Sequence, residues 1–228
     1  MSEDKKAWQP MQQSLSPKKD KHTKQTPSPL NTRPTTQGET RKQMIKRIRI
    51  TSESSPLFLT TWQLYCNAFP KEEVRPMSYH AAALSKEAFH ADALLDAETD
   101  QFIGLLFWWD LHRVRYIEHL ATAPTLRGKG SGKEALEQFI NENDKPILLE
   151  VEHPDCEIAT RRINFYKRLG FALSPLAYKH PPYWAESKDF VSLAIMTTQG
   201  AITAEELQHF VKEEHPLIHF RHPFHNLC

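Results

Sequence analysis

Apolar positions recur with two different periods in the first part of the chain, and the two periods predict different elements. Residues 45–51 alternate apolar and basic side chains with a period of two, which is typical of a half-buried strand. Residues 57–69 carry apolar side chains at helical spacing, and Pro70 directly after them ends the predicted helix. A second helix is predicted over residues 78–89.

The middle of the chain predicts three strands joined by short turns. Residues 91–97 and 101–111 flank Glu98-Thr99-Asp100, a hairpin signal, and residues 112–122 form the third strand. A glycine-rich loop and a helix to about Asn143 follow.

The remaining chain alternates strands with helices. The predicted elements are a strand at 146–152, a helix at 157–169 with Gly170 as its C-cap, strands at 171–178 and 190–197, and a helix at 203–214 whose Thr203 and Glu206 are spaced as a capping box. Strands linked first by hairpins and then by helices predict an α/β fold, a mixed sheet with helices on both faces.

The glycine-rich loop is the first candidate for chemistry. The chain has seven glycines, and three of them, Gly128, Gly130 and Gly132, lie within five positions beside Arg127 and Lys129. Glycine lets the backbone approach a bulky anion, and the helix that follows presents unpaired amides and a positive dipole end to it. The loop therefore predicts a pyrophosphate-binding site.

Three phosphate-binding patterns compete for this loop. A P-loop fails, because Arg127 stands where its first glycine belongs and Glu134 replaces the magnesium-binding hydroxyl. A Rossmann fingerprint fits Gly130-x-Gly132-x-x-Ala135 in its relaxed form, but residues 124–125 separate the strand from the glycines. The third pattern, Arg/Gln-x-x-Gly-x-Gly/Ala, is matched by Arg127-x-x-Gly130-x-Gly132 at every position.

This third pattern belongs to the GNAT superfamily of acetyl-CoA-dependent N-acetyltransferases, which the sequence resembles over residues 44–198. Residues 116–132 resemble the fourth strand of the family, its bulge and its pyrophosphate loop, and Tyr166-x-x-x-Gly170-Phe171 resembles the motif of the next helix. Residues 148–154 and 180–183 resemble a bacterial subgroup whose substrates are mostly unassigned. The resemblance implies a twisted, mostly antiparallel sheet of about six to seven strands, with helices on both faces and splayed central strands.

The resemblance also assigns the cofactor site. Backbone amides of the loop would bind the pyrophosphate of acetyl-CoA, and the strand edge at Leu120, Ala121 and Thr122 would pair with its pantetheine arm. The loop residues concerned are Arg127, Gly128, Lys129, Gly130, Ser131, Gly132 and Lys133. Many members have an Asn seven residues before the helix tyrosine, and Ala159 stands there instead, which puts one CoA contact in doubt.

Two residues are predicted to be catalytic in attack of a primary amine on the thioester. Tyr166 matches the tyrosine that donates a proton to the CoA thiolate in the family, and its pKa near ~10 keeps it protonated. Glu118 is the candidate base, on the strand face shared with Tyr116 and Leu120. A salt bridge from Glu118 to a nearby arginine, such as Arg113 or Arg115, is an equally good interpretation. Glu150 and Glu152 are the reserve bases, and water-mediated deprotonation is a further alternative.

Aromatic and histidine residues are weaker candidates. The acceptor site is expected near an aromatic set, with the Pro181-Pro182 loop as a lid, although core packing is the commoner role of strand aromatics. The set is Trp108, Trp109, Tyr178, His180, Tyr183 and Trp184. Four histidines near the C-terminus invite a metal interpretation, but a solvated tail is favoured and no metal is predicted. They are His215, His219, His222 and His225.

Composition and charge indicate the domain boundaries and the cellular compartment. Residues 1–43 hold nine Lys/Arg against four Asp/Glu with almost no aliphatic side chains, so they predict a disordered basic tail before the domain at 44–200; Met44 as the native start is an alternative. Residues 201–228 are expected to pack on that domain or trail from it. Three widely spaced cysteines argue against a disulfide framework and favour the cytoplasm. No apolar run approaches the roughly twenty residues of a membrane span.

The sequence therefore predicts an N-acetyltransferase that acts directly, in a ternary complex of acetyl-CoA and a small-molecule or peptide amine. No specific nucleic acid or membrane partner is predicted, and a homodimer is left open. Two other functions compete. One is a non-catalytic acyl-CoA-binding sensor, and the other is a Rossmann-type dinucleotide-binding protein.

Overall fold

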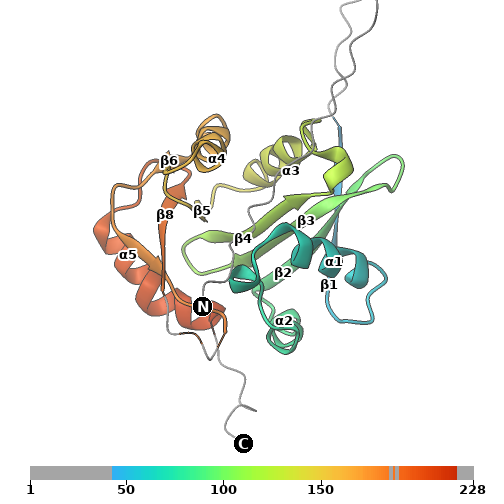
Figure 1. The fold of residues 1–228 in the computed structure, drawn as a ribbon, viewed down its shortest axis with the longest axis horizontal. Coiled ribbons are helices and arrows are strands. Elements are labelled where there is room, and N and C mark those ends of the chain that lie inside the picture. The colour runs from blue at the N-terminus through green and yellow to red at the C-terminus, as the bar shows by residue number, and fades with distance from the viewer. Residues whose placement is uncertain (1–42, 185–186, 188–189, 220–228) are drawn as a thin grey trace, which may run out of the picture. The chain divides into compact units, whose positions relative to one another are not determined.

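The computed structural model describes residues 43–184, 187 and 190–219. Eight strands form the sheet: β1 Ile45–Ile50, β2 Phe89–Asp96, β3 Phe102–Asp110, β4 Arg115–Thr122, β5 Ile147–Val151, β6 Ala172–Leu173, β7 Tyr178–His180 and β8 Val191–Thr197. Their order is β1-β2-β3-β4-β5-β8-β6, and β7 pairs with β8 off this path (Figure 1). The count exceeds the predicted six to seven because the expected strand at 171–178 is two short strands, β6 and β7.

One neighbouring pair of strands, β4 and β5, is parallel, and the other pairs in the described sheet are antiparallel. This confirms the predicted mixed, mostly antiparallel sheet. It also excludes the Rossmann alternative, which requires a mostly parallel sheet.

Helices cover both faces of the sheet. The described helices are α1 Phe58–Ala68, α2 Met77–Leu84, α3 Ser131–Ile140, α4 Glu157–Lys167, α5 Ala204–His209 and α6 His215–Ile218, with 3-10 turns at Lys71–Glu73 and Pro124–Leu126 and a π-helical turn at Phe210–Glu214. Residues of α1, α2, α5 and α6 join one buried apolar cluster, and residues of α3 and α4 join the other (Figure 1). The central strand β3 is apolar almost throughout because both of its faces are covered.

Two predicted boundaries were wrong. The helix expected over 78–89 ends at Leu84, and Phe89 instead opens β2, where it is 1% exposed and pairs with Trp109. The strand expected at 112–122 begins at Arg115, because the amide of Leu111 bonds to the carbonyl of Val114 and closes a turn.

The C-terminal helix begins as predicted and then departs from the prediction. The capping box is present, since Thr203 accepts from the amide of Glu206 and the Glu206 side chain accepts from the amide of Thr203. The chain then passes through the π-helical turn and continues to Ile218, which is 1% exposed. Residues 201–218 thus contribute to the core of the domain.

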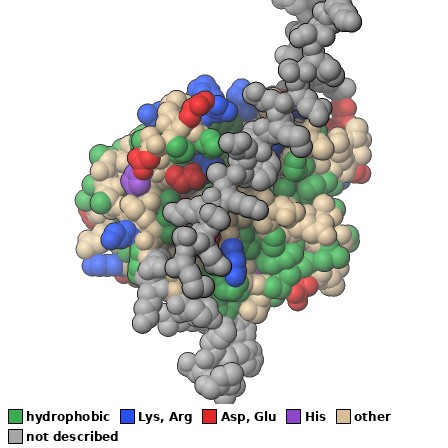
Figure 2. Space-filling view, in the orientation of Figure 1, with side chains coloured by type: hydrophobic (Ala, Val, Ile, Leu, Met, Phe, Trp, Pro, Cys, Tyr) green, Lys and Arg blue, Asp and Glu red, His purple; other side chains and the backbone are tan. Residues whose placement is uncertain are grey.

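Charge on the described surface is mixed in the view of Figure 2, where acidic and basic side chains are interspersed. Among the described helices, none combines the length and hydrophobicity that a bilayer crossing demands. The tail predicted at 1–43 lies outside the described residues except for Gln43, whose side chain accepts a hydrogen bond from Ser131 Oγ at 2.9 Å.

Candidate active site

The glycine-rich loop connects β4 to α3 in a backbone conformation that side chains rarely adopt. Gly128 has φ +76° and Gly130 has φ +93°, and Gly130 is the N-cap of α3. A Cβ atom at either position would meet nothing within 4 Å, so the loop surface is open there. Left-handed φ values are the reason for glycine at these two positions.

The amides at the start of α3 provide an anion-binding surface. The first helical hydrogen bond runs from the amide of Glu134 to the carbonyl of Gly130, so the preceding amides of Ser131, Gly132 and Lys133 have no acceptor within the helix. The amides of Arg127 and Lys129 are different, because they bond to carbonyls of the preceding turn at 3.4 and 3.3 Å. The donors therefore concentrate at residues 131–133.

The side chains of the loop offer fewer groups for binding an anion than its backbone amides do. Arg127 and Lys129 are exposed, and Lys133 pairs with Glu137 at 3.2 Å. The buried hydroxyl of Ser131 faces Gln43, so this residue offers only its amide to a ligand. A Cβ atom on Gly132 would lie 3.1 Å from the Thr122 methyl group, which shows how closely α3 approaches β4.

Beside this loop, β4 and β5 separate. They pair in parallel at only three positions, ending at Ile117 and Leu149, after which β4 continues to Thr122 and β5 pairs only with β8. The other edge of β4 remains bonded to β3 through residues 120–122. The edge of residues 120–122 that faces β5 thus has no strand partner among the described residues, as the predicted splay requires.

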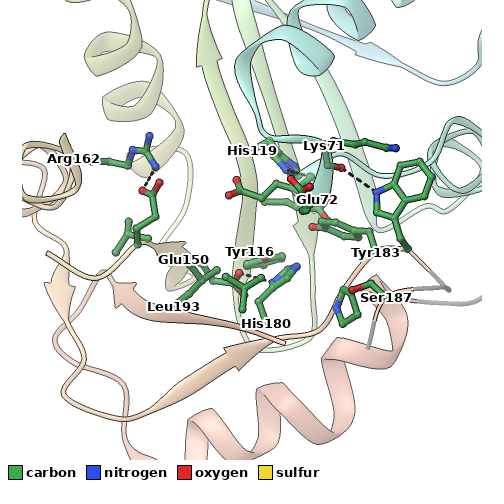
Figure 3. Close-up of a pocket in the computed structure, with 17 residues that line it drawn as sticks. Lys71, Glu72, Tyr116, His119, Glu150, Arg162, His180, Tyr183, Ser187 and Leu193 are labelled. Carbon is green, nitrogen blue, oxygen red and sulfur yellow. Dashed lines mark hydrogen bonds and ion pairs between the residues drawn. The ribbon is translucent and has the colours of Figure 1, made fainter. Parts of the chain in front are cut away.

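A cavity of about 510 Å³ lies in this opening (Figure 3). The 3-10 turn after α1, strands β4, β5, β7 and β8, and helix α4 all contribute to its walls. Figure 3 shows Glu150 and Arg162 on one side and His119, Lys71 and Tyr183 on the other. The lining residues are Lys71, Glu72, Glu73, Tyr116, Glu118, His119, Glu150, Val151, Glu152, Arg162, His180, Pro182, Tyr183, Trp184, Ser187, Val191 and Leu193.

Glu118 occupies a β-bulge and is fully engaged. Phe107 pairs with His119 and Trp108 with Ile117, so Glu118 is the extra residue of β4. Its side chain is 1% exposed and accepts from Arg75 at 2.5 Å, from Tyr183 at 2.5 Å and from Trp109 Nε1 at 3.1 Å.

Two expectations for Glu118 were wrong. Its cationic partner is Arg75, neither Arg113 nor Arg115; the Arg115 guanidinium instead donates to the carbonyl of Phe139 at the end of α3, at 2.7 Å. Leu120 does not share its face either. The bulge shifts the alternation by one residue, and Leu120 packs in the cluster on the opposite side of the sheet from Tyr116.

A second polar network surrounds Glu150. Oε2 of Glu150 lies 2.7 Å from Nδ1 of His180, and Oε1 accepts from the Tyr178 hydroxyl at 2.5 Å. Burial opposes ionisation of Glu150, but His180 outweighs it and lowers the pKa of the carboxyl. Burial likewise disfavours the imidazolium, yet Glu150 raises the pKa of His180. The pair therefore favours carboxylate and imidazolium together, which leaves Glu150 a weak base.

Two of the four C-terminal histidines, His215 and His219, were wrongly expected to be solvated. His215 is buried and its Nε2 lies 2.7 Å from the Tyr178 hydroxyl, while the His219 ring lies 4.7 Å from that of His180. Burial lowers the pKa of His215 to about 4, so it is neutral at pH 7. Among the described residues no group of three metal-ligating side chains was found, and His222 and His225 lie outside them.

Tyr166 lies on α4, one turn after the cavity-lining Arg162. It is half-buried, its ring contacts those of Phe165 and Phe171 at 5.2 and 5.6 Å, and its hydroxyl has no hydrogen-bond partner among the described residues. Burial raises its pKa, so the phenol is protonated at neutral pH. Arg162 itself is paired with Glu152.

The other candidates divide between cavity and core. His180, Tyr183 and Trp184 line the cavity together with Pro182 of the expected lid. Trp108 faces the other cluster and donates to Asp92 at 2.9 Å, so it is a core residue. Trp109 donates to Glu118 and Tyr178 donates to Glu150, and neither of the two residues lines the cavity. Ala159, 3% exposed, packs in the core at the start of α4.

The cavity residues that the sequence analysis missed include Glu73, His119 and Arg162, and it also missed Arg75, the ion-pair partner of Glu118. A signal was present for His119, which directly follows the candidate base. The turn at residues 70–76 carries no motif, and its place against β4 arises only in the folded chain.

Comparison with known proteins agrees with this geometry. A family model described as an acetyltransferase (GNAT) domain matches residues 90–173. A solved GNAT-family protein from Bacteroides thetaiotaomicron is 32% identical, with a TM-score of 0.69, over 78% of this chain and 99% of the other. The chain belongs to the GNAT family.

Two further solved acetyltransferases are more distantly similar to the chain. The ribosomal-protein-S18-alanine N-acetyltransferase from Escherichia coli is 17% identical over 71% of this chain and 97% of its own, with a TM-score of 0.48. A GNAT acetyltransferase from Elizabethkingia anophelis with acetyl-CoA bound is 13% identical over 68% and 97%, with a TM-score of 0.44. No curated protein matches the chain. As a GNAT protein it is an acyltransferase of the acyl-CoA-dependent class.

Proposed function

We propose that this protein transfers an acetyl group from acetyl-CoA to a primary amine bound in the cavity between β4 and β5. The main observation behind the proposal is that two binding features lie near the end of β4: a free strand edge and the unpaired amides of a helix. Beyond Ile117 the edge of β4 is free and borders the cavity at Glu118 and His119, and the unpaired helix amides begin at Ser131, nine residues after the end of β4 at Thr122.

The residues present fit the cofactor. The left-handed glycines Gly128 and Gly130 leave the loop surface open, and the amides of residues 131–133 offer donors that suit a pyrophosphate. Exposed Arg127 and Lys129 add positive charge beside it. At Leu120, Ala121 and Thr122 the edge of β4 that faces away from β3 is unpaired among the described residues. Its backbone groups can hydrogen-bond to the two amides of a pantetheine arm as a further strand would.

Acetyl-CoA supplies an acetyl thioester: the amine nitrogen bonds to its carbonyl carbon, the carbon–sulfur bond breaks, and the thiolate leaves. Direct transfer needs no enzyme nucleophile, and the described cysteines, Cys66 and Cys156, are free and exposed, outside the cavity lining. Tyr166 is proposed as the acid that protonates the leaving thiolate, because its hydroxyl is protonated and has no other partner among the described residues.

The acceptor amine must also lose a proton, and the next question is which group accepts it. Glu118 was predicted, but its carboxylate already accepts three hydrogen bonds, and its 1% exposure leaves little room for an ammonium. We propose that Glu118 positions Arg75 and Tyr183 at the cavity wall, and that the proton of the ammonium leaves through water in the cavity. Glu118 as a base stays a prediction, and so does the cytoplasmic location inferred from the cysteine pattern.

Calorimetry with acetyl-CoA and a thiol-release assay test the proposal. Wild-type protein should bind acetyl-CoA in preference to NAD and release thiol with a primary amine. Ala at both Gly128 and Gly130 should weaken acetyl-CoA binding at least about tenfold, because the loop amides are displaced.

Gly200→Ala is the matched control, since Gly200 has φ +102° and equally open surroundings, away from the cavity lining. It carries similar backbone strain but should leave acetyl-CoA affinity unchanged. Equal losses in both variants would refute the loop as the binding site. If acetyl-CoA binds tightly but no amine causes thiol release, the result would favour the non-catalytic sensor.

A further inference from the structure

The turn Lys71–Glu73 is fixed against the cavity by its backbone. The carbonyl of Glu73 accepts from the Tyr65 hydroxyl at 3.1 Å and lies 3.0 Å from Nε2 of His119, while the Trp184 indole donates to the carbonyl of Lys71 at 3.0 Å. These contacts come from α1, β4 and the loop after β7. They hold the turn in place without using the carboxylate of Glu73.

Glutamates dominate the charged lining of the cavity. Three of the five have cationic partners: Glu118 with Arg75, Glu150 with His180, and Glu152 with Arg162. Glu72 and Glu73 have no ion pair among the described residues, and of these two Glu72 is exposed while Glu73 is half-buried. Within the described part of the cavity lining, Glu73 is thus the half-buried glutamate that has no cationic partner.

Glu73 lines the cavity between β4 and β5, and its neighbours there act on its carboxylate in opposite directions. Burial raises the pKa of Glu73, Glu152 raises it further, and Arg162 and His180 act against this increase. Glu152 directly follows β5, Arg162 lies on α4 and His180 on β7, and all three line the cavity together with Glu73. A carboxylate that is desolvated and beside another carboxylate is stabilised by an added cation.

The remaining lining is suited to a hydrocarbon body. Tyr116, Tyr183, Trp184 and the neutral ring of His119 form aromatic walls; burial lowers the pKa of His119 to about 4. Valine and leucine from β8 complete them. Aromatic rings attract an ammonium group at their faces and pack against its carbon chain.

We propose that Glu73 binds the ammonium group of the acceptor, and that the acceptor is a primary alkylammonium with a hydrocarbon body and no carboxylate beside the amine. An α-carboxylate would lie among the glutamates and be repelled. This inference rests on the proposed function, because it names the substrate class of the same cavity.

Two probes of equal skeleton test the inference: phenethylamine, and phenylalanine, which adds the carboxylate. With saturating acetyl-CoA, wild-type kcat/KM should favour phenethylamine by about a hundredfold, as expected when like charges are brought together. Glu73→Gln should raise KM for phenethylamine about tenfold, leave KM for acetyl-CoA unchanged and reduce the discrimination. Glu73→Asp should recover part of the loss.

Glu87→Gln is the control for net charge, since Glu87 is exposed and does not line the cavity. It should behave as wild type. An unchanged KM for phenethylamine in Glu73→Gln, or a preference for phenylalanine, would overturn the inference.

Calorimetry separates this inference from the proposed function. Phenethylamine is titrated into protein saturated with CoA, which reports binding without turnover. Binding that is lost in Glu73→Gln supports the recognition role even if wild type releases no thiol, in which case only the transfer proposal fails. Absence of phenethylamine binding to the wild type would overturn the inference, while thiol release with other amines would leave the proposed function intact.

Discussion

The Arg75–Glu118 ion pair joins four separate parts of the chain, and its removal gives a quantitative test of the site's architecture. The two side chains are 3% and 1% exposed and 2.5 Å apart. The guanidinium also lies 5.0 Å from the Tyr183 ring and donates weakly, at 3.3 Å, to the carbonyl of Ile218. Replacing Arg75 by Met keeps the volume but leaves the carboxylate of Glu118 buried without a cation.

The magnitude follows from what remains around Glu118. Breaking a buried pair by removing one partner costs about 3–5 kcal/mol. Trp109 and Tyr183 still donate to Glu118 at 3.1 and 2.5 Å, so we expect the lower end, about 3 kcal/mol. For a domain of this size that corresponds to a decrease in Tm of about 6–12 °C. Arg75→Met combined with Glu118→Gln removes both charges and should recover about 2 kcal/mol of the summed single losses.

Urea denaturation of the two single variants, the double variant and the wild type gives the coupling energy. The matched control is the pair Arg161 and Glu157 on α4, which are 2.6 Å apart but 73% and 85% exposed. The same cycle on that pair should give less than about 0.5 kcal/mol, because water screens both charges. A coupling at Arg75–Glu118 no larger than this control would refute the reasoning that the pair acts as a desolvated unit.

Two further predictions concern the acid and the buried histidines. Tyr166→Phe should lower kcat by about 100-fold or more while leaving the Kd of acetyl-CoA unchanged, and an unaltered kcat in the thiol-release assay would exclude Tyr166 as the acid. Burial, followed by Arg75, lowers the pKa of His80 to about 3, so the unfolded chain binds a proton below pH 6.5 that the folded protein excludes. The free energy of unfolding should therefore fall as pH decreases from 7 toward 3. In urea titrations, His80→Phe should remove about 1 kcal/mol of the loss that occurs between pH 6 and pH 5. The same pH dependence in the variant and the wild type would contradict the assignment.

Much of the architecture was determined by the sequence itself. The alternation at residues 45–51, the glycine spacing of the loop and the capping box of Thr203 and Glu206 each specify a local structure, and each is present. Local patterns succeed because backbone φ, helix amides and strand alternation depend on residues only a few positions apart. The family resemblance followed from motifs of the same kind.

Which residues the side chains around the cavity contact was decided by the tertiary structure. Glu118 finds its cation 43 residues away rather than in the neighbouring arginines, and a single bulge turns Leu120 to the opposite face. His215 and Tyr178 meet across 37 residues, so a residue predicted to lie in a solvated tail instead packs against the network around Glu150. Such pairings depend on how the sheet opens and on which loops close over it, and no short-range pattern encodes them, because their energy comes from burial and charge that exist only once distant segments are packed together.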